Sequence, residues 1–135
     1  RRTPLGMAHA TFRSTRGGES GVPFSTVLLS AYASDAGLYV PESLPILKPE
    51  ELRQWAGLRM SEVCARVMSY FVDLPLYQLE DITSAAFGTF NGGCQPPLPL
   101  VRVDGDLLLE TGNGPTLAFK DIGQQVVARL LGVYL

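Results

Sequence analysis

Several residue types that would signal a function are scarce in this 135-residue chain. It contains one histidine and two cysteines, and its two lysines, Lys48 and Lys120, stand against nine arginines. Cys64 and Cys94 match no zinc spacing and no redox pair, so we expect two free thiols, no metal site and a reducing compartment, cytoplasmic or organellar. The formal net charge is −2 and no basic run is present, which argues against a nucleic-acid partner.

The sequence also lacks a membrane-spanning segment. No apolar stretch approaches the roughly 20 residues that such a helix needs, so we expect no membrane partner. The basic start at Arg1 and Arg2 is not followed by an apolar segment, so no secretory signal is visible, although the start is compatible with the remnant of a transit peptide. We expect residues 1–11 to be a flexible N-terminal segment in which His9 is incidental.

Hydrophobic periodicity predicts a mostly helical α/β chain, with a hydrophobic fraction of 46% that is sufficient for a packed core. Short extended pieces are expected at 11–15 and 38–40. Helices are expected at four places, with Ser61 as the N-cap of the third: 24–32, 49–55, 61–71 and 76–90. The apolar positions expected to face the core of the last two are Val63, Val67, Tyr70, Phe71, Leu79, Ile82, Ala86 and Phe90.

The strongest strand signal is a hairpin. Two apolar runs, 100–103 and 106–110, flank Asp104-Gly105, a pair that supplies the positive φ angles of a two-residue turn. After a loop comes an amphipathic helix whose apolar stripe continues to the end of the chain without a capping glycine. We therefore expect the chain to be truncated in the middle of a larger protein. The stripe consists of Ile122, Val126, Leu130 and Val133.

Lys120 is the residue whose position suggests chemistry. We place it in the first turn of the last helix, where the helix dipole disfavours a cation but helps an amine that has to lose its proton. A nucleophilic lysine needs that neutral form to attack an aldehyde at neutral pH. The loop before it contains Gly112, Asn113 and Gly114, so a ligand could approach its backbone. A solvated surface lysine paired with Asp121 is the alternative that the residues leave open.

Three segments resemble sequences of the threonine synthase family. Residues 114–121, Gly-Pro-Thr-Leu-Ala-Phe-Lys-Asp, follow a strand ending at Glu110 and are similar to the family's cofactor-lysine motif. Residues 14–17, Ser-Thr-Arg-Gly, resemble its N-terminal motif. Residues 35–42, Asp-Ala-Gly-Leu-Tyr-Val-Pro-Glu, resemble its signature Asp-Gly-Gly-Leu-Tyr-Val-Pro-Glu. Because the three occur in the family's order, the resemblance covers nearly the whole chain.

The resemblance implies a fold and a domain organisation. The chain would be the N-terminal domain of a tryptophan-synthase-β-like (fold type II) enzyme, made of helices with a small sheet and a hairpin. Residues 12–98 would form that domain, and residues 99–135, the hairpin and the lysine-bearing helix, would begin an incomplete cofactor domain. The chain would end before the main parallel-sheet domain.

The resemblance also implies a reaction. Lys120 would hold pyridoxal 5'-phosphate as a Schiff base and then act as the base at the substrate α-carbon, with the cofactor as electron sink. The substrate would be the phosphorylated amino acid O-phosphohomoserine, which reacts with water to give threonine and phosphate. The remaining C-terminal domain of the same protein would complete the cofactor site, so this chain alone would be inactive.

Other residues are weaker candidates for the site. Arg16, together with Arg13, could reach the substrate phosphate, because a guanidinium suits phosphate geometry. Thr116 could cap the last helix or contact the substrate. Asn113 could contact the substrate or hold a turn.

The departures from the family leave the substrate open. The family usually has glycine at the position of Ala36, and commonly has an aromatic residue followed by histidine at the positions of Gly112 and Asn113. One alternative is a threonine-synthase-like phospho-lyase, which acts on a β-phosphorylated amino acid and releases a keto acid and ammonia. Another is a non-catalytic truncated paralogue that serves as a binding or signalling module.

Overall fold

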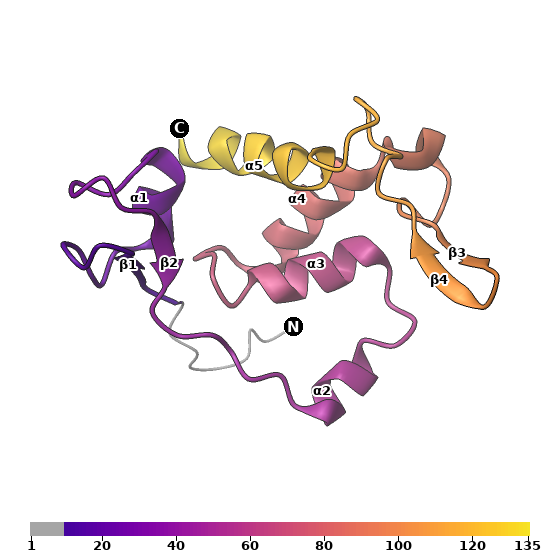
Figure 1. Cartoon of the computed structure of the whole chain (residues 1–135), viewed down its shortest axis with the longest axis horizontal. Coiled ribbons are helices and arrows are strands. Elements are labelled where there is room, and N and C mark those ends of the chain that lie inside the picture. Colours follow the sequence, from indigo (N-terminus) through magenta and orange to yellow (C-terminus); the bar gives the residue numbers. More distant parts are fainter. Residues whose placement is uncertain (1–9) are drawn as a thin grey trace. The chain divides into compact units, whose positions relative to one another are not determined.

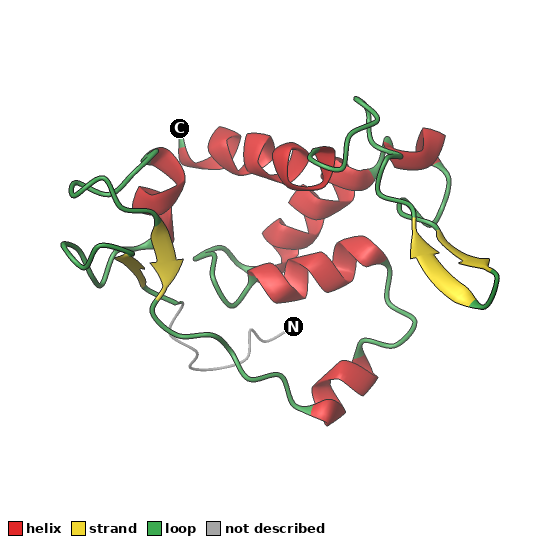
Figure 2. Cartoon of the chain, viewed as in Figure 1, coloured by secondary structure: helices red, strands yellow, loops and turns green. Residues whose placement is uncertain are grey.

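The computed structural model describes residues 10–135, which form two compact units. One unit contains the chain up to Gly57 together with Ala65–Leu79, and the other contains Leu58–Cys64 together with Glu80–Leu135. Figure 2 shows that helices and loops dominate, with strands confined to two short pairs. The predicted flexible segment falls mainly on residues 1–9, including His9, which lie outside the described residues. Within the described part, no helix has the length and apolar character needed to cross a membrane.

The first unit contains a small antiparallel sheet (Figure 1, indigo to purple). Strand β1 (Phe12–Ser14) pairs with β2 (Tyr39–Pro41), so both extended pieces expected from the sequence are confirmed. On the buried face of β1, the ring of Phe12 packs against Phe24 of helix α1 (Phe24–Leu29), with ring centroids 6.1 Å apart. This aromatic contact joins the sheet to the first helix.

The predicted helices exist, but several of their ends differ from the prediction. Helix α2 (Pro49–Gln54) agrees with it closely, with proline in the first turn. Helix α1 stops at Leu29 instead of residue 32, because Ser30 has an extended conformation with φ −108° and ψ 127°. An extended residue cannot continue the α-helical hydrogen-bond ladder.

Helix α3 (Met60–Met68) begins before Ser61, so the predicted capping role of Ser61 is wrong. The carboxylate of Glu62 accepts a hydrogen bond of 2.8 Å from the backbone N–H of Arg59 and stabilises the helix start instead. The predicted buried face is also shifted. Val67 is 40% exposed, whereas Ala65 is fully buried.

Helix α4 (Leu76–Phe87) has the core face that the sequence predicts. Leu79 and Ala86 are fully buried and Ile82 is nearly so. Phe90, also buried, lies beyond the helix in the short 3-10 turn η1 (Phe90–Gly93). The predicted helix end at residue 90 is wrong, because the α-helix stops at Phe87. The left-handed φ angles of Asn91 and Gly92, which a right-handed helix excludes, lie further along the chain.

The second unit contains the predicted hairpin and the last helix (Figure 1, orange and yellow). Strand β3 (Leu100–Val103) pairs with β4 (Asp106–Leu109), and the turn residues between them have positive φ angles. In helix α5 (Asp121–Tyr134), Val126 and Leu130 of the predicted stripe are buried. The rest of the stripe is less covered: Val133 is 45% exposed.

The first testable prediction concerns Ala36, which has a left-handed backbone with φ +60°. A Cβ disfavours this conformation, so Ala36→Gly should raise the free energy of unfolding by about 0.5–1 kcal/mol in urea denaturation of the protein at its full natural length. Ala33→Gly is the matched control, because Ala33 is 4% exposed and its φ is not positive. That change should lower stability by about 1 kcal/mol. Destabilisation by Ala36→Gly would contradict the prediction.

Candidate functional site

Lys120 lies immediately before α5, at its N-cap position, and not inside the first turn as predicted. Its carbonyl oxygen accepts hydrogen bonds from the N–H groups of Gly123 (3.2 Å) and Gln124 (3.0 Å), so the backbone of Lys120 is tied to the helix. Its side chain is exposed. Among residues 10–135 it forms no ion pair, which leaves the amine available to a ligand.

Asp121 organises the loop in front of Lys120. Its carboxylate is 1% exposed and accepts hydrogen bonds from the Thr116 N–H (2.7 Å) and the Thr116 hydroxyl (2.8 Å). The predicted cap role of Thr116 is therefore wrong. Lys120 holds the N-cap position of α5, and the Thr116 hydroxyl donates to the Asp121 carboxylate, whereas a cap would accept from a helix N–H. The alternative interpretation of Lys120 as the ion-pair partner of Asp121 is not supported either.

The segment 114–120, here called the lysine loop, is closed tightly by these contacts. A Cβ on Gly114 would lie 2.8 Å from the Asp121 Cγ and nearer still to its Oδ2, so only glycine fits beside the buried carboxylate. The N–H of Leu117 donates to the Gly114 carbonyl at 3.0 Å, and Leu117 has a left-handed φ of +59°. A residue other than glycine in this conformation is strained, so the loop shape depends on the contacts that close it.

Asn113 holds a turn just before the lysine loop. Its carbonyl accepts a 2.8 Å hydrogen bond from the Asn91 N–H, and its amide donates to the Glu110 carbonyl at 3.4 Å. A substrate contact by Asn113 stays a prediction. Sequence reasoning missed Asn91, although the run of asparagine and two glycines at 91–93 is a signal for a left-handed turn.

A shallow cavity of about 480 Å³ lies beside Lys120. Most of the surrounding side-chain surface is apolar, and Phe119 and Val127 are 64% and 44% exposed. An amine at the edge of an apolar surface suits a cofactor with an aldehyde and an aromatic ring, because the ring can pack while the amine reacts. The lining residues are Phe119, Lys120, Ile122, Gly123, Gln124 and Val127.

Lys48 lies at the exposed end of a surface loop, as the sequence suggests, and this position is also the N-cap of α2. The helix-dipole argument therefore does not distinguish Lys120 from Lys48. Their surroundings do distinguish them, because α2 has Glu50 and Glu51 in its first turn, whereas Asp121 is buried and bonded to Thr116.

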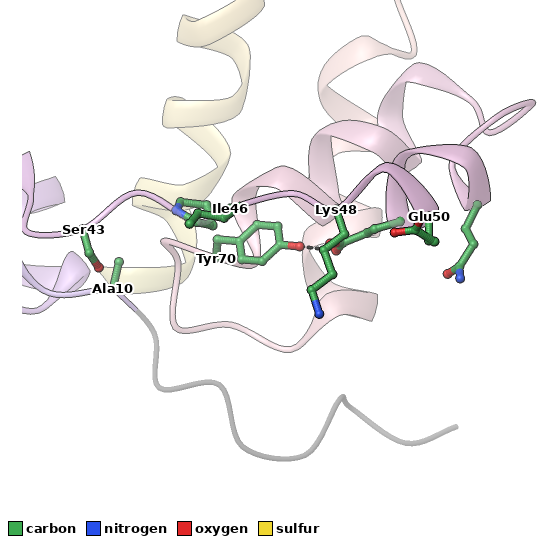
Figure 3. Close-up of a pocket in the computed structure, with 9 residues that line it drawn as sticks. Ala10, Ser43, Ile46, Lys48, Glu50 and Tyr70 are labelled. Atoms are coloured by element: carbon green, nitrogen blue, oxygen red, sulfur yellow. Dashed lines mark hydrogen bonds between the residues drawn. The ribbon is translucent and has the colours of Figure 1, made fainter.

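A larger cavity of about 610 Å³ lies in the first unit, beside Lys48 (Figure 3). There the Tyr70 hydroxyl donates a hydrogen bond to Glu51. Burial, and then this hydrogen bond, raise the pKa of Tyr70 to about 12. None of the candidate site residues from the sequence lines this larger cavity. Lys120 therefore stays the candidate because of its exposed amine beside an apolar surface, although its cavity is smaller.

The N-terminal motif and the central signature form one interlocked element. The Asp35 carboxylate accepts hydrogen bonds from the Ser14 hydroxyl (2.6 Å), the Gly37 N–H (2.9 Å) and the Gly18 N–H (2.8 Å). A Cβ on Gly18 would lie 2.6 Å from the Asp35 Oδ2, so glycine is needed there. The co-occurrence of the two motifs thus has a physical cause.

Arg16 belongs to this element through its own contacts. Its N–H donates to the Ser14 hydroxyl at 3.1 Å, and its guanidinium donates to the Asp35 carbonyl at 3.1 Å. Arg13 lies on the exposed face of β1. The structure therefore gives Arg16 a structural role, and its contact with a substrate phosphate stays a prediction.

Three carboxylates of the first unit have pKa values below the usual range because each accepts hydrogen bonds. The Ser14 hydroxyl is the largest cause for Asp35. Ser34, followed by the Tyr39 hydroxyl, lowers the pKa of Glu19. Hydrogen bonds from Thr11 and the Gly21 N–H lower the pKa of Glu42.

Comparison with known proteins decides the family. A family model described as "Threonine synthase N terminus" matches residues 11–87, more than half of the chain. The chain belongs to the threonine synthase N-terminus family.

Relatives and solved structures agree with this family. The chain is 41% identical over 120 residues to the threonine synthase of Pseudomonas aeruginosa, covering 87% of this chain and 25% of that protein. It is 33% identical over 128 residues to threonine synthase-like 2 of Xenopus laevis, covering 92% and 27%. Its structure matches that of PLP-bound threonine synthase from Brucella melitensis with a TM-score of 0.86 at 35% identity, covering 93% of this chain and 27% of that one.

These matches confirm the predicted fold class: a small α/β chain with helices and two small sheets, which matches threonine synthase structures over about a quarter of their length. The chain spans about a quarter of the length of the relatives it matches.

The second prediction is that the folded state loses stability at acidic pH. Because the folded-state pKa values of Asp35, Glu19 and Glu42 are lowered, their stabilisation is complete above the unfolded carboxyl pKa of about 4 and is lost as the pH falls through the folded values. Chemical denaturation between about pH 5 and pH 3 should show falling stability. Ser14→Ala should reduce this pH dependence, because it removes the main donor to Asp35. Exposed Ser43→Ala is the control, and an equal effect of both changes would refute the prediction.

The third prediction concerns Gly114. Gly114→Ala should lower the free energy of unfolding by about 1–3 kcal/mol, because the new Cβ overlaps the buried Asp121 side chain. Gly132→Ala in α5 meets no atom within 4 Å and should be neutral or stabilising by up to about 1 kcal/mol. Thermal unfolding of the two variants checks this, and equal tolerance at both positions would be inconsistent with a closed lysine loop.

Proposed function

We propose that the protein carrying this chain is a pyridoxal-phosphate-dependent threonine synthase, which converts O-phosphohomoserine and water into threonine and phosphate. The proposal rests on one observation: the exposed, unpaired amine of Lys120 is presented by a tightly closed loop beside an apolar cavity. The family membership of the chain and the PLP-bound state of the Brucella melitensis relative support it.

The residues present fit this cofactor. Lys120 would bind the aldehyde carbon through its Nζ, while Phe119 and Ile122 offer apolar surface to a ring. When bound, the cofactor supplies an electron sink for negative charge at the substrate α-carbon. Gly112, Pro115 and Thr116 are exposed, so a substrate could approach the chain beside Lys120.

The chain's own contribution to the reaction is proton transfer and positioning. The Nζ of Lys120 would take the proton from the substrate α-carbon and deliver it within the same site, as a positioned general base and acid. Thr116, Asn113 and Arg16 are the proposed substrate contacts. The groups that hold the cofactor phosphate and ring nitrogen would come from the C-terminal part of the protein.

The exposed apolar residues of the hairpin support such a C-terminal partner domain. Apolar side chains on both faces of β3 and β4 are at least half exposed, whereas strands with two apolar faces are normally buried on both sides. We propose that the rest of the same protein covers them. The exposed hairpin residues are Leu100, Val103, Leu107, Leu108 and Leu109.

The free thiols support the proposed reducing compartment. Cys64 and Cys94 form no disulfide. Burial raises the pKa of the Cys64 thiol, which keeps it protonated and unreactive. We propose a cytoplasmic or organellar location on this basis.

The fourth prediction tests the role of Lys120 in the protein at its full natural length. After incubation with pyridoxal phosphate, borohydride should trap the cofactor covalently on the peptide that contains Lys120, as mapped by mass spectrometry. Lys120→Ala should lose the trapped adduct and lower turnover at least ~10³-fold while keeping the fold. Lys120→Arg should fail as well, because a guanidinium stays protonated.

Lys48 is the internal control, because it also stands at a helix N-terminus. Lys48→Ala should leave the cofactor spectrum and turnover unchanged. Trapping on Lys48 or on a lysine outside this chain, or wild-type turnover by Lys120→Ala, would overturn the proposed function.

The products of the same preparation separate threonine synthase from the phospho-lyase alternative. That alternative is favoured by Gly112 and Asn113, which replace the aromatic residue and histidine common in the family. Release of threonine and phosphate from O-phosphohomoserine supports the synthase. Release of a keto acid, ammonia and phosphate from a β-phosphorylated amino acid, with no threonine formed, supports the lyase.

A further inference from the structure

We propose that Asp121 is a positioning residue, which holds Lys120 in its reactive place through two hydrogen bonds from Thr116. The inference rests on the proposed function, because it concerns the lysine that would bind the cofactor. It goes beyond that function by assigning a role to a side chain that itself points away from solvent.

The first observation is the environment of the carboxylate. Asp121 is 1% exposed, yet among the described residues no Lys or Arg side chain pairs with it. A buried carboxylate without a cation is costly unless donors compensate it. The donors here are the N–H and hydroxyl of Thr116, together with the favourable dipole at the start of α5.

The second observation is what these hydrogen bonds enclose. Thr116 and Asp121 are five residues apart, and Lys120 lies inside the closed segment, next to its anchor. The two large apolar side chains of that segment, Leu117 and Phe119, are 78% and 64% exposed and bury little apolar surface, while Ala118 is partly buried. Packing of these two side chains therefore contributes little to the loop shape. The side-chain contact that closes the segment is the one between Asp121 and Thr116, which acts together with backbone hydrogen bonds such as that from the Asp121 N–H to the Ala118 carbonyl (3.0 Å).

The third observation is strain at the tip of the lysine loop. Leu117 has a φ of +59°, a conformation that a leucine avoids unless its surroundings impose it. Loss of the closing contact would let Leu117 relax toward negative φ. That relaxation would move the backbone that leads into Lys120.

The test compares Thr116→Val with Thr116→Ser in the protein at its full natural length. Valine matches threonine in shape but lacks the hydroxyl donor, whereas serine keeps it. The apoprotein is mixed with pyridoxal phosphate, and borohydride quenching at successive times gives the rate of adduct formation on Lys120. Because a hydrogen bond to a carboxylate is lost, Thr116→Val should slow this rate about tenfold, and Thr116→Ser should stay within about twofold of the wild type.

A second readout needs no cofactor. Chymotrypsin cleavage of the apoprotein after Leu117 or Phe119 reports opening of the lysine loop. Cleavage should be about tenfold faster in Thr116→Val and unchanged in Thr116→Ser. Gln125→Ala is the matched control, because it removes a side-chain contact to Arg129 on the same helix but outside the lysine loop. It should change neither rate.

A double-mutant cycle shows whether the two residues act through one contact. Asp121→Asn keeps the side-chain shape but removes its charge, and should slow adduct formation about tenfold. If Asp121 acts through Thr116, the double variant should be no slower than the slower single variant. Rates are measured on protein whose circular dichroism and melting show it to be folded, and if Asp121→Asn does not fold, the Thr116 pair decides alone.

The outcomes separate the inference from the proposed function. If wild-type Lys120 forms no adduct, the proposed function fails, and with it the role of Asp121 toward the cofactor. If the wild type forms the adduct but Thr116→Val reacts at the wild-type rate, or the effects of Thr116→Val and Asp121→Asn multiply independently, the inference alone is overturned.

Discussion

Two loops of this chain, the one around residues 14–18 and the lysine loop, are each held by a carboxylate that accepts hydrogen bonds from a hydroxyl and a backbone N–H. In the first unit Asp35 accepts them from Ser14 and Gly37, and in the second Asp121 accepts them from Thr116. In both places a glycine stands where any Cβ would overlap the carboxylate side chain. The conformation of such loops is determined by hydrogen bonds to the carboxylate and by the lack of room for a Cβ, with little contribution from a hydrophobic core.

This mode of stabilisation suits a loop that has to present a functional group. The lysine loop cannot bury its own side chains and still offer Lys120 to a ligand, so hydrogen bonds have to hold it. A buried carboxylate at the helix start does so at short range, because the donors and the presented lysine lie within the same six residues, 116–121. The charge also suits the helix dipole, so one side chain serves both the helix and the loop.

The same logic explains why a lysine at a helix N-terminus is insufficient as evidence of chemistry. Lys48 and Lys120 share that position. Lys48 is followed by proline and two acids in the first turn, a common helix start. Lys120 lies beside an apolar cavity, and the aspartate that follows it accepts its hydrogen bonds from Thr116 and forms none with Lys120. The two lysines therefore differ in the contacts of the acidic residues that follow them and not in their own position on the helix.

Local patterns predicted much of the secondary structure. The two apolar runs around Asp104-Gly105 determine the hairpin, because that turn needs positive φ angles and a matching register. The period of α4 identifies Leu79, Ile82 and Ala86 as buried. Helix ends were less predictable: α4 stops at Phe87 instead of residue 90, and α3 starts before Ser61 because Glu62 supplies the cap.

By itself, the sequence predicted the family and the fold class, because contiguous motifs in a fixed order carry the resemblance. The role of Lys120 stays a prediction, since the residues alone also allow a solvated surface lysine. Only the tertiary structure decided that residues 14–18 and 35–37 form one interlocked element, since the Asp35 contacts join segments about twenty residues apart. It also decided that Thr116 bonds to Asp121 instead of capping α5. A hydroxyl of this kind has several acceptors within reach along the chain, and which one it meets depends on the backbone path between them.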